Sequence, residues 1–191
     1  MVEIVILGGT IHPICSESME EGYIILKNGK ILDIGKGKPS QKVIYGREVH
    51  DYRGYHILPG FVDAHTHLGI LEEKMGEIGK DPVAPHLRAL DAVNPNDAGF
   101  KDALRAGVTT VMTGPGSNNP VGGLNLAVKT YGTIIDQMVV KNPTGLKLAL
   151  GENPMTAYGS QNNMPVTRMG IMALIREMFV RTQDFKKQKD S

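Results

Sequence analysis

The sequence of 191 residues is 41% hydrophobic and 21% charged, and its 21 basic and 20 acidic side chains leave a formal net charge of +1. This composition is typical of a globular protein with enough apolar material for one large domain or two small ones. The balanced charge gives no sign of the concentrated basic surface that nucleic acids and anionic membranes require, so we expect neither partner. The single cysteine, Cys15, excludes an intrachain disulfide. No signal-like apolar segment precedes it, which favours a cytoplasmic location.

Residues 1–58 show short apolar stretches separated by turn residues, which predicts a β-rich segment. We expect strands at 3–7, 22–26 and 30–35 and extended chain at 42–45 and 48–52. Asn28-Gly29 lies between the second and third of these strands. Asn-Gly between two apolar strands is the strongest short signal for a β-hairpin.

The segment Pro59-Gly-Phe-Val-Asp-Ala-His-Thr-His67 places two histidines two positions apart at the end of a predicted strand. Side chains at positions i and i+2 of a strand point to the same face, so His65 and His67 can both reach one metal ion. Pro59-Gly60 precedes the strand and Leu68-Gly69 ends it, which puts the pair at the C-terminal tip. Enzymes built on β/α barrels carry their active sites at this end of the strands.

After residue 61 the pattern changes to strands alternating with helices, which predicts βα units around a parallel sheet. In chain order we expect a helix from Asn96-Asp97 to Ala106, strands at 108–112 and 146–150, and a long amphipathic helix from about Thr167 to Lys187. The segment 124–140 fits either a hairpin or a strand followed by a short helix. The pattern does not decide between the two.

The residues from Pro59 to His67 resemble the first barrel strand of the metal-dependent amidohydrolase superfamily, whose signature there is Pro-Gly-(Phe/Leu/Met)-(Ile/Val)-Asp-x-His-x-His. The resemblance is to its imidazolonepropionase-related group. It implies an α/β fold with part of a small β-sandwich domain at 1–58, followed at 59–191 by the N-terminal half of a TIM-like (β/α) barrel. A complete barrel takes about 250 residues, whereas 133 residues follow position 58.

The resemblance also implies a divalent metal, most naturally zinc, held by His65 and His67. A further ligand can come from Glu152, just beyond the last predicted strand, or from a carboxylated Lys147, whose strand parity points it into the barrel. We favour Glu152 because the Leu-Gly-Glu-Asn-Pro turn resembles an acidic strand tip of the family's deacetylase branch, and Lys147 remains the alternative. No histidine follows His86. The family's later ligands and its proton-shuttling aspartate are therefore missing from this sequence, and two imidazoles alone rarely hold a catalytic ion.

For the intact enzyme, the resemblance implies that a metal-activated water hydrolyses a carbon–nitrogen bond in a small linear or cyclic amide. His86 and Arg88 lie in a loop that follows a strand and could bind a carboxylate or amide oxygen, although such residues more often serve packing and surface roles. We expect this chain by itself to be inactive. The alternative is a non-catalytic fragment or assembly subunit, whose exposed barrel edges bind a complementary half-barrel or a second copy of the chain.

Overall fold

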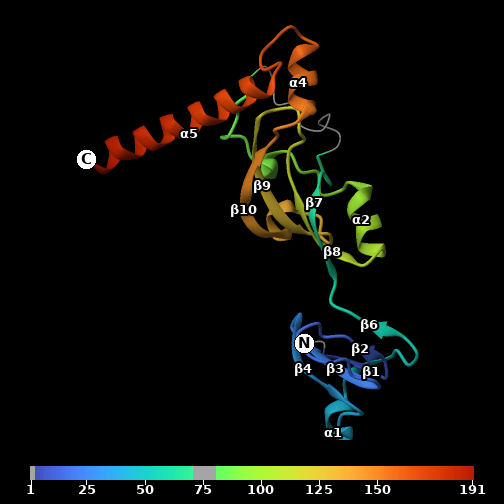
Figure 1. Cartoon of the computed structure of the whole chain (residues 1–191). Helices are drawn as coiled ribbons and strands as arrows, with labels where there is room; N and C mark the ends of the chain where they lie inside the picture. Colours follow the sequence, from blue (N-terminus) through green and yellow to red (C-terminus); the bar gives the residue numbers. More distant parts are fainter. Residues whose placement is uncertain (1–2, 71–80) are drawn as a thin grey trace. The chain divides into compact units, whose positions relative to one another are not determined.

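The computed structural model describes residues 3–70 and 81–191, and the chain divides into two compact units, 1–59 and 60–191 (Figure 1). Each unit has its own sheet and is described by itself. Among the described residues, none of the helices combines the length and the apolar character that crossing a membrane requires.

The first unit is built mainly of strands. Its elements are β1 (Glu3–Leu7), β2 (Thr10–Ile11), β3 (Gly22–Lys27), β4 (Lys30–Lys36), α1 (Gln41–Ile44), β5 (Glu48–Asp51) and β6 (His56–Ile57). Four strands form a sheet in the order β4-β3-β1-β5, and β2 pairs with β6. The predicted hairpin is confirmed: Asn28 and Gly29 connect β3 to β4 with φ angles of 54° and 72°, as a tight hairpin turn demands.

The extended chain predicted at 42–45 is wrong, because this segment forms the single helical turn α1. Its β-branched residues had favoured a strand. The backbone N–H of Val43 instead donates to the carbonyl of Ser40 at 2.9 Å and closes a local turn. With no neighbouring strand to pair with, the local hydrogen bond decides the conformation.

The second unit combines a mixed sheet with helices. Its elements are β7 (Phe61–Thr66), the 3-10 helix η2 (Ala89–Asp91), α2 (Ala98–Arg105), β8 (Val108–Thr113), β9 (Val121–Lys129), α3 (Ile135–Met138), β10 (Val139–Leu148), α4 (Glu152–Gly159) and α5 (Arg168–Asp190). The strand order is β10-β9-β8-β7. β7 and β8 are parallel, whereas β9 is antiparallel to both of its neighbours.

The prediction of strands alternating with helices around a parallel sheet is therefore wrong at two points: no helix separates β8 from β9, and β9 is antiparallel to β8 and β10. The connection from β8 to β9 spans only residues 114–120, which is too short for the crossover that parallel pairing needs. The segment 124–140, left open by the sequence, contains most of β9, then α3 and the start of β10. The strand predicted at 146–150 is the end of β10, which finishes at Leu148.

Both predicted long helices are confirmed, and each begins at a side-chain cap. Asp97 precedes α2 and accepts a hydrogen bond from the backbone N–H of Gly99. Thr167 precedes α5 and accepts one from Gly170. These bonds satisfy N–H groups that have no partner within the helix.

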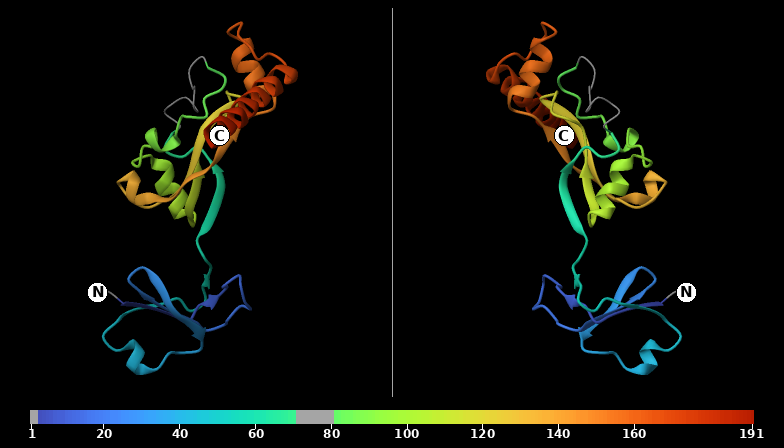
Figure 2. Two further views of the ribbon diagram at one scale, coloured as in Figure 1. Left: turned by 90° about the vertical axis from the view of Figure 1, so that its left-hand side faces the viewer. Right: turned by 90° about the vertical axis from the view of Figure 1, so that its right-hand side faces the viewer.

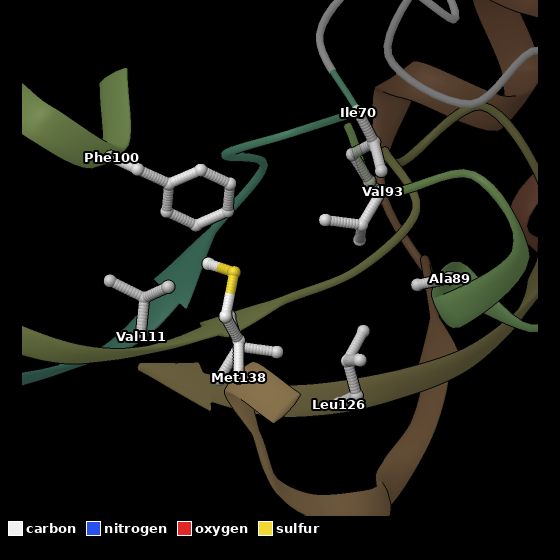
Figure 3. Packing of buried hydrophobic residues seen from close by; sticks show 8 residues of the cluster. Ile70, Ala89, Val93, Phe100, Val111, Leu126 and Met138 are labelled. Carbon is white, nitrogen blue, oxygen red and sulfur yellow. The ribbon is translucent and has the colours of Figure 1, made fainter. Parts of the chain in front are cut away.

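The main core of the second unit lies on one face of its sheet. Figure 3 shows Phe100 of α2, Val111 of β8, Leu126 of β9 and Met138 of α3 directed toward one another. Each of these four side chains is at most 2% exposed. Because strand side chains alternate between faces, the neighbours of the buried strand residues point to the opposite face of the sheet.

The beginning of α5 forms a smaller cluster with the sheet. Ile171 and Ile175 pack with Val121 of β9, and Leu146 of β10 lies against the same group. Figure 2 shows α4 and α5 at the end of the sheet where β10 finishes. The rest of α5 extends away from the sheet and is largely exposed (Figure 1).

Candidate metal centre

The C-terminal ends of β7, β8 and β10 lie at the same end of the sheet in the second unit. β9 is antiparallel to both β8 and β10, so β10 runs in the same direction as β7 and β8. An open cavity of about 350 Å³, which we call the histidine pocket, lies among these strand ends. Its lining residues are His65, Thr66, His67, Met112, Gly114, Pro115, Asn125, Leu146, Lys147 and Leu148.

His67 is half-buried in this pocket, and its ring is held by a backbone group. Its Nδ1 lies 2.7 Å from the carbonyl oxygen of Gly114. A carbonyl can only accept, so Nδ1 carries the hydrogen and Nε2 of the neutral ring keeps its lone pair. Histidines that bind metals commonly have their second nitrogen fixed in this way. The arrangement therefore leaves Nε2 of His67 ready to act as a ligand.

His65 lies beside His67, with the ring centroids 5.5 Å apart and the ring planes at 76°. The His65 side chain is exposed, and its backbone N–H donates to Oδ1 of Asp63 at 3.1 Å. Both imidazoles line the same pocket. Their role as metal ligands remains a prediction.

Two further hydrogen bonds fasten the tip of β7 to the end of β8. The hydroxyl of Thr66 donates to the carbonyl of Met112 at 3.0 Å. The hydroxyl of the fully buried Thr113 donates to the carbonyl of Leu68 at 2.7 Å. The backbone on both sides of His67 is therefore anchored to the neighbouring strand, which limits its movement.

Comparison with known proteins gives several matches. No protein-family model matches the chain. Over 187 residues, covering 88% of the chain, it is 26% identical to "Amidohydrolase tasK" of Hapsidospora irregularis. Over 64 residues, covering 30% of the chain, it is 39% identical to the imidazolonepropionase of Streptococcus sanguinis (strain SK36). The crystal structure of an amidohydrolase from Thermotoga maritima MSB8 covers 98% of the chain with a TM-score of 0.89 and 39% sequence identity. The chain belongs to the amidohydrolase superfamily.

The resemblance drawn from residues 59–67 is thus confirmed, and the match is to the N-terminal portion of imidazolonepropionase-related amidohydrolases. The chain spans about half of the Thermotoga amidohydrolase, 49% of its length, and 19% and 15% of the two curated relatives. The names of these relatives indicate a hydrolase family. The α/β character of the fold is confirmed, whereas the TIM-like barrel remains a prediction.

The two candidates for a further ligand in this amidohydrolase chain lie in different surroundings. Lys147 is half-buried on β10 and lines the histidine pocket. Glu152 is exposed, begins α4 and is not among the pocket residues. A carboxylate in the first helical turn interacts favourably with the helix dipole, which gives Glu152 a structural role. The geometry therefore favours Lys147 over Glu152, the reverse of the preference drawn from the sequence.

His86 and Arg88 do not line the histidine pocket. His86 borders a separate cleft of about 530 Å³ between the segment 81–86 and α5. Arg88 forms an ion pair with Asp91 at 2.7 Å, and its hydrogen bonds to that carboxylate raise the pKa of Arg88 above its usual value. A surface role explains Arg88 directly, and substrate binding by either residue remains a prediction.

Asn125 of β9 is a pocket residue that the sequence did not indicate. Its side chain is 8% exposed and lies among the lining residues of the histidine pocket. The neighbouring Leu126 belongs to the core on the opposite face of the sheet, so alternation alone would have placed Asn125 here. That signal was not usable, because the limits of β9 were not predicted.

The side chains that line the pocket could supply some, but not all, of the ligands of a zinc site. Among residues 3–70 and 81–191, no three histidine, cysteine, aspartate or glutamate side chains lie close enough together to hold a metal ion. Catalytic zinc sites use three protein ligands and a water. His65 and His67 supply two imidazoles, and Lys147 could supply a third group only as a carboxylated side chain.

Proposed function

We propose that this chain carries the first metal ligands of an amidohydrolase that hydrolyses a carbon–nitrogen bond in a small linear or cyclic amide. The observation that carries the proposal is the histidine pocket, which is lined by His65 at the end of β7, by His67 just beyond it and by Lys147 of β10. This pocket lies at the C-terminal ends of three strands that run in the same direction. The superfamily of the relatives supports the same chemistry.

In this proposal His65, His67 and a carboxylated Lys147 hold a divalent ion, most naturally zinc. The ion, when bound, polarises the amide carbonyl and activates water for attack. The protein keeps His67 in the tautomer that presents Nε2, through the Gly114 carbonyl. Carboxylation converts the cationic amine of Lys147 into an anionic oxygen donor, and oxygen donors of this kind suit zinc.

We further propose that the chain alone turns over no substrate. Two imidazoles bind zinc weakly, and the proton shuttle that the family takes from an aspartate is not assigned to any residue here. Losing such a general base typically removes about 10² to 10⁴ in rate. The proposal places the enzyme in the cytoplasm, where thiols stay reduced, and the single exposed Cys15 suits that setting.

The test combines metal content with turnover. The purified chain is dialysed against zinc or manganese and assayed with cyclic amides, linear dipeptides and acylated sugars. We expect weak zinc binding that His65→Ala and His67→Ala abolish, with His50→Ala as the control outside the second unit, and no turnover. A monodisperse monomer that hydrolyses a cyclic amide in a zinc-dependent way would contradict the inactivity. Zinc binding unchanged in both variants would contradict the site.

A second candidate function is that of an assembly subunit, which the edge strand β7 favours. Among the strands of the described residues, β7 pairs with β8 alone, and Phe61 and Val62 are 57% and 68% exposed. An unpaired edge with exposed apolar residues is a site for pairing with another strand. The partner in this proposal is a complementary half-barrel, with self-association as the other outcome.

Native mass, measured with and without Val62→Lys, tests this candidate. A charge at the edge should prevent strand pairing. The control is Tyr131→Lys, at a residue that is exposed and lies between β9 and α3. Equal association of the two variants would rule out pairing through β7.

A further inference from the structure

The carbonyl of Gly114 determines which nitrogen of His67 faces the pocket. The 2.7 Å contact with Nδ1 requires the Nδ1–H tautomer, because a carbonyl oxygen can only accept a hydrogen bond. If the Gly114 peptide rotated or moved by a few tenths of an ångström, this bond would weaken and the ring could turn or change tautomer. The position of the Gly114 peptide is therefore a control point for the proposed ligand.

Gly114 follows directly after β8, so the sheet ladder does not extend to it. The last strand residue, Thr113, is anchored by its bond to the carbonyl of Leu68. Beyond it, the chain continues through Gly114, Pro115 and Gly116 without regular structure. A side chain packed against Gly114 can therefore help to hold its carbonyl in place.

Asn125 is that side chain. A Cβ atom built on Gly114 would lie 1.8 Å from Oδ1, 2.6 Å from Cγ and 3.2 Å from Cβ of Asn125. The amide of Asn125 thus occupies the space beside the Gly114 Cα, with no room for even a methyl group. Both residues are buried, so neither can move aside easily.

We propose that Asn125 is a positioning residue for His67. Its amide holds the Gly114 peptide so that the carbonyl keeps His67 as the Nδ1–H tautomer, with Nε2 available in the pocket. The effect on metal affinity rests on the proposed function, in which His67 is a ligand. The effect on the tautomer does not depend on that function, because it is a property of the chain without metal.

The geometry gives a compensating pair of substitutions. Asn125→Ala removes the amide and leaves the Gly114 peptide unsupported. Gly114→Ala drives a methyl group into that amide. In the double variant the new Cβ of residue 114 occupies the vacated space, 3.2 Å from the Cβ of residue 125 before relaxation. Each single change should therefore disturb His67. The combination should restore it in part, because the 3.2 Å contact between the two Cβ atoms still requires a small shift. Such non-additivity is expected for residues in contact.

The tautomer is read from ¹H–¹⁵N correlations of the imidazole rings at neutral pH in the metal-free chain. The chain has six histidines, and loss of signals in His67→Gln identifies those of His67. We expect the Nδ1–H form in the wild-type chain, a mixture in Asn125→Ala and in Gly114→Ala, and a return toward Nδ1–H in the double variant. The control is Asn119→Ala, which removes another buried amide, bonded to the carbonyl of Asp81, and should leave the tautomer unchanged.

Zinc titration of the same variants gives the second readout. The loss of a group that supports a ligand typically weakens metal binding about 10- to 100-fold, and we expect this in Asn125→Ala with recovery in the double variant. A wild-type Nε2–H tautomer, or an unchanged tautomer in Asn125→Ala, would overturn the positioning role. If Gly114→Ala fails to fold, the wild-type and Asn125→Ala spectra still decide. If the tautomer changes as expected but His67→Gln leaves zinc binding unchanged, the metal function would be refuted and the positioning role would remain.

Discussion

Replacing Asp97 with alanine should destabilise the second unit by about 2.5 to 4 kcal/mol. Oδ1 of Asp97 accepts the N–H of Gly99 at 2.8 Å and caps α2. Oδ2 accepts the N–H of the buried Gly69 at 2.8 Å, two residues beyond His67. Loss of a cap costs about 1 kcal/mol, and loss of a hydrogen bond to a charged group costs about 1.5 to 3 kcal/mol. One carboxylate thus joins the helix to the histidine strand.

Urea unfolding followed by circular dichroism measures this effect. The matched control is Asp102→Ala on the same helix, whose exposed ion pair with Arg105 spans 3.2 Å. Exposed pairs of this kind contribute about 0 to 1 kcal/mol, so the control should change little. Asp97→Asn keeps one acceptor oxygen and should lie between the two. Equal unfolding midpoints for Asp97→Ala and Asp102→Ala would refute the double role of Asp97.

Three further predictions follow from the same structure. Lys147→Met should reduce zinc stoichiometry more than Glu152→Gln, and the opposite order, measured by metal analysis after gel filtration, would transfer the ligand role to Glu152. Phe100→Ala should lower the free energy of unfolding in urea by about 3 to 5 kcal/mol, because Phe100 is only 2% exposed. Phe179→Ala, on the exposed part of α5, should lower it far less. Similar losses in the two variants would contradict the assigned core. Hydrogen bonds from Lys27 and then from Arg47 lower the pKa of Glu3 below 4.5. The stabilisation from Glu3 is therefore complete above pH 4.5 and is lost as the pH falls through the lowered pKa. In thermal unfolding, Glu3→Gln should lose less stability on acidification than the wild-type chain does. An identical loss of stability in both would contradict this.

The features predicted from sequence are those whose physical cause is local. The turn at Asn28-Gly29, the cap at Asp97 and the amphipathic helix that begins after Thr167 each depend on residues within a few positions of one another. The i, i+2 spacing of His65 and His67 is local in the same sense, and it placed both rings at one pocket. Such features depend only on neighbouring residues in the sequence, so they can be predicted without knowledge of tertiary contacts.

The direction of β9 and the contents of the pocket depend on contacts between distant residues. The strand pattern of β9 is compatible with parallel or antiparallel pairing, and only the short connection after β8 excludes the parallel form. Asn125 reaches Gly114 because β9 pairs with β8, which no local pattern states. For Lys147, strand parity pointed toward the pocket, whereas the resemblance of a turn pointed to Glu152. Parity agrees with the geometry because it follows directly from the strand backbone.

The most direct test of the central claim, that His65 and His67 bind one divalent ion, is a crystal structure of the chain with saturating zinc, with anomalous diffraction at the zinc edge. We predict an ion in the histidine pocket about 2.0 to 2.1 Å from one nitrogen of each ring, through Nε2 in His67. A zinc ion elsewhere, with both imidazoles directed away from it, would contradict the account.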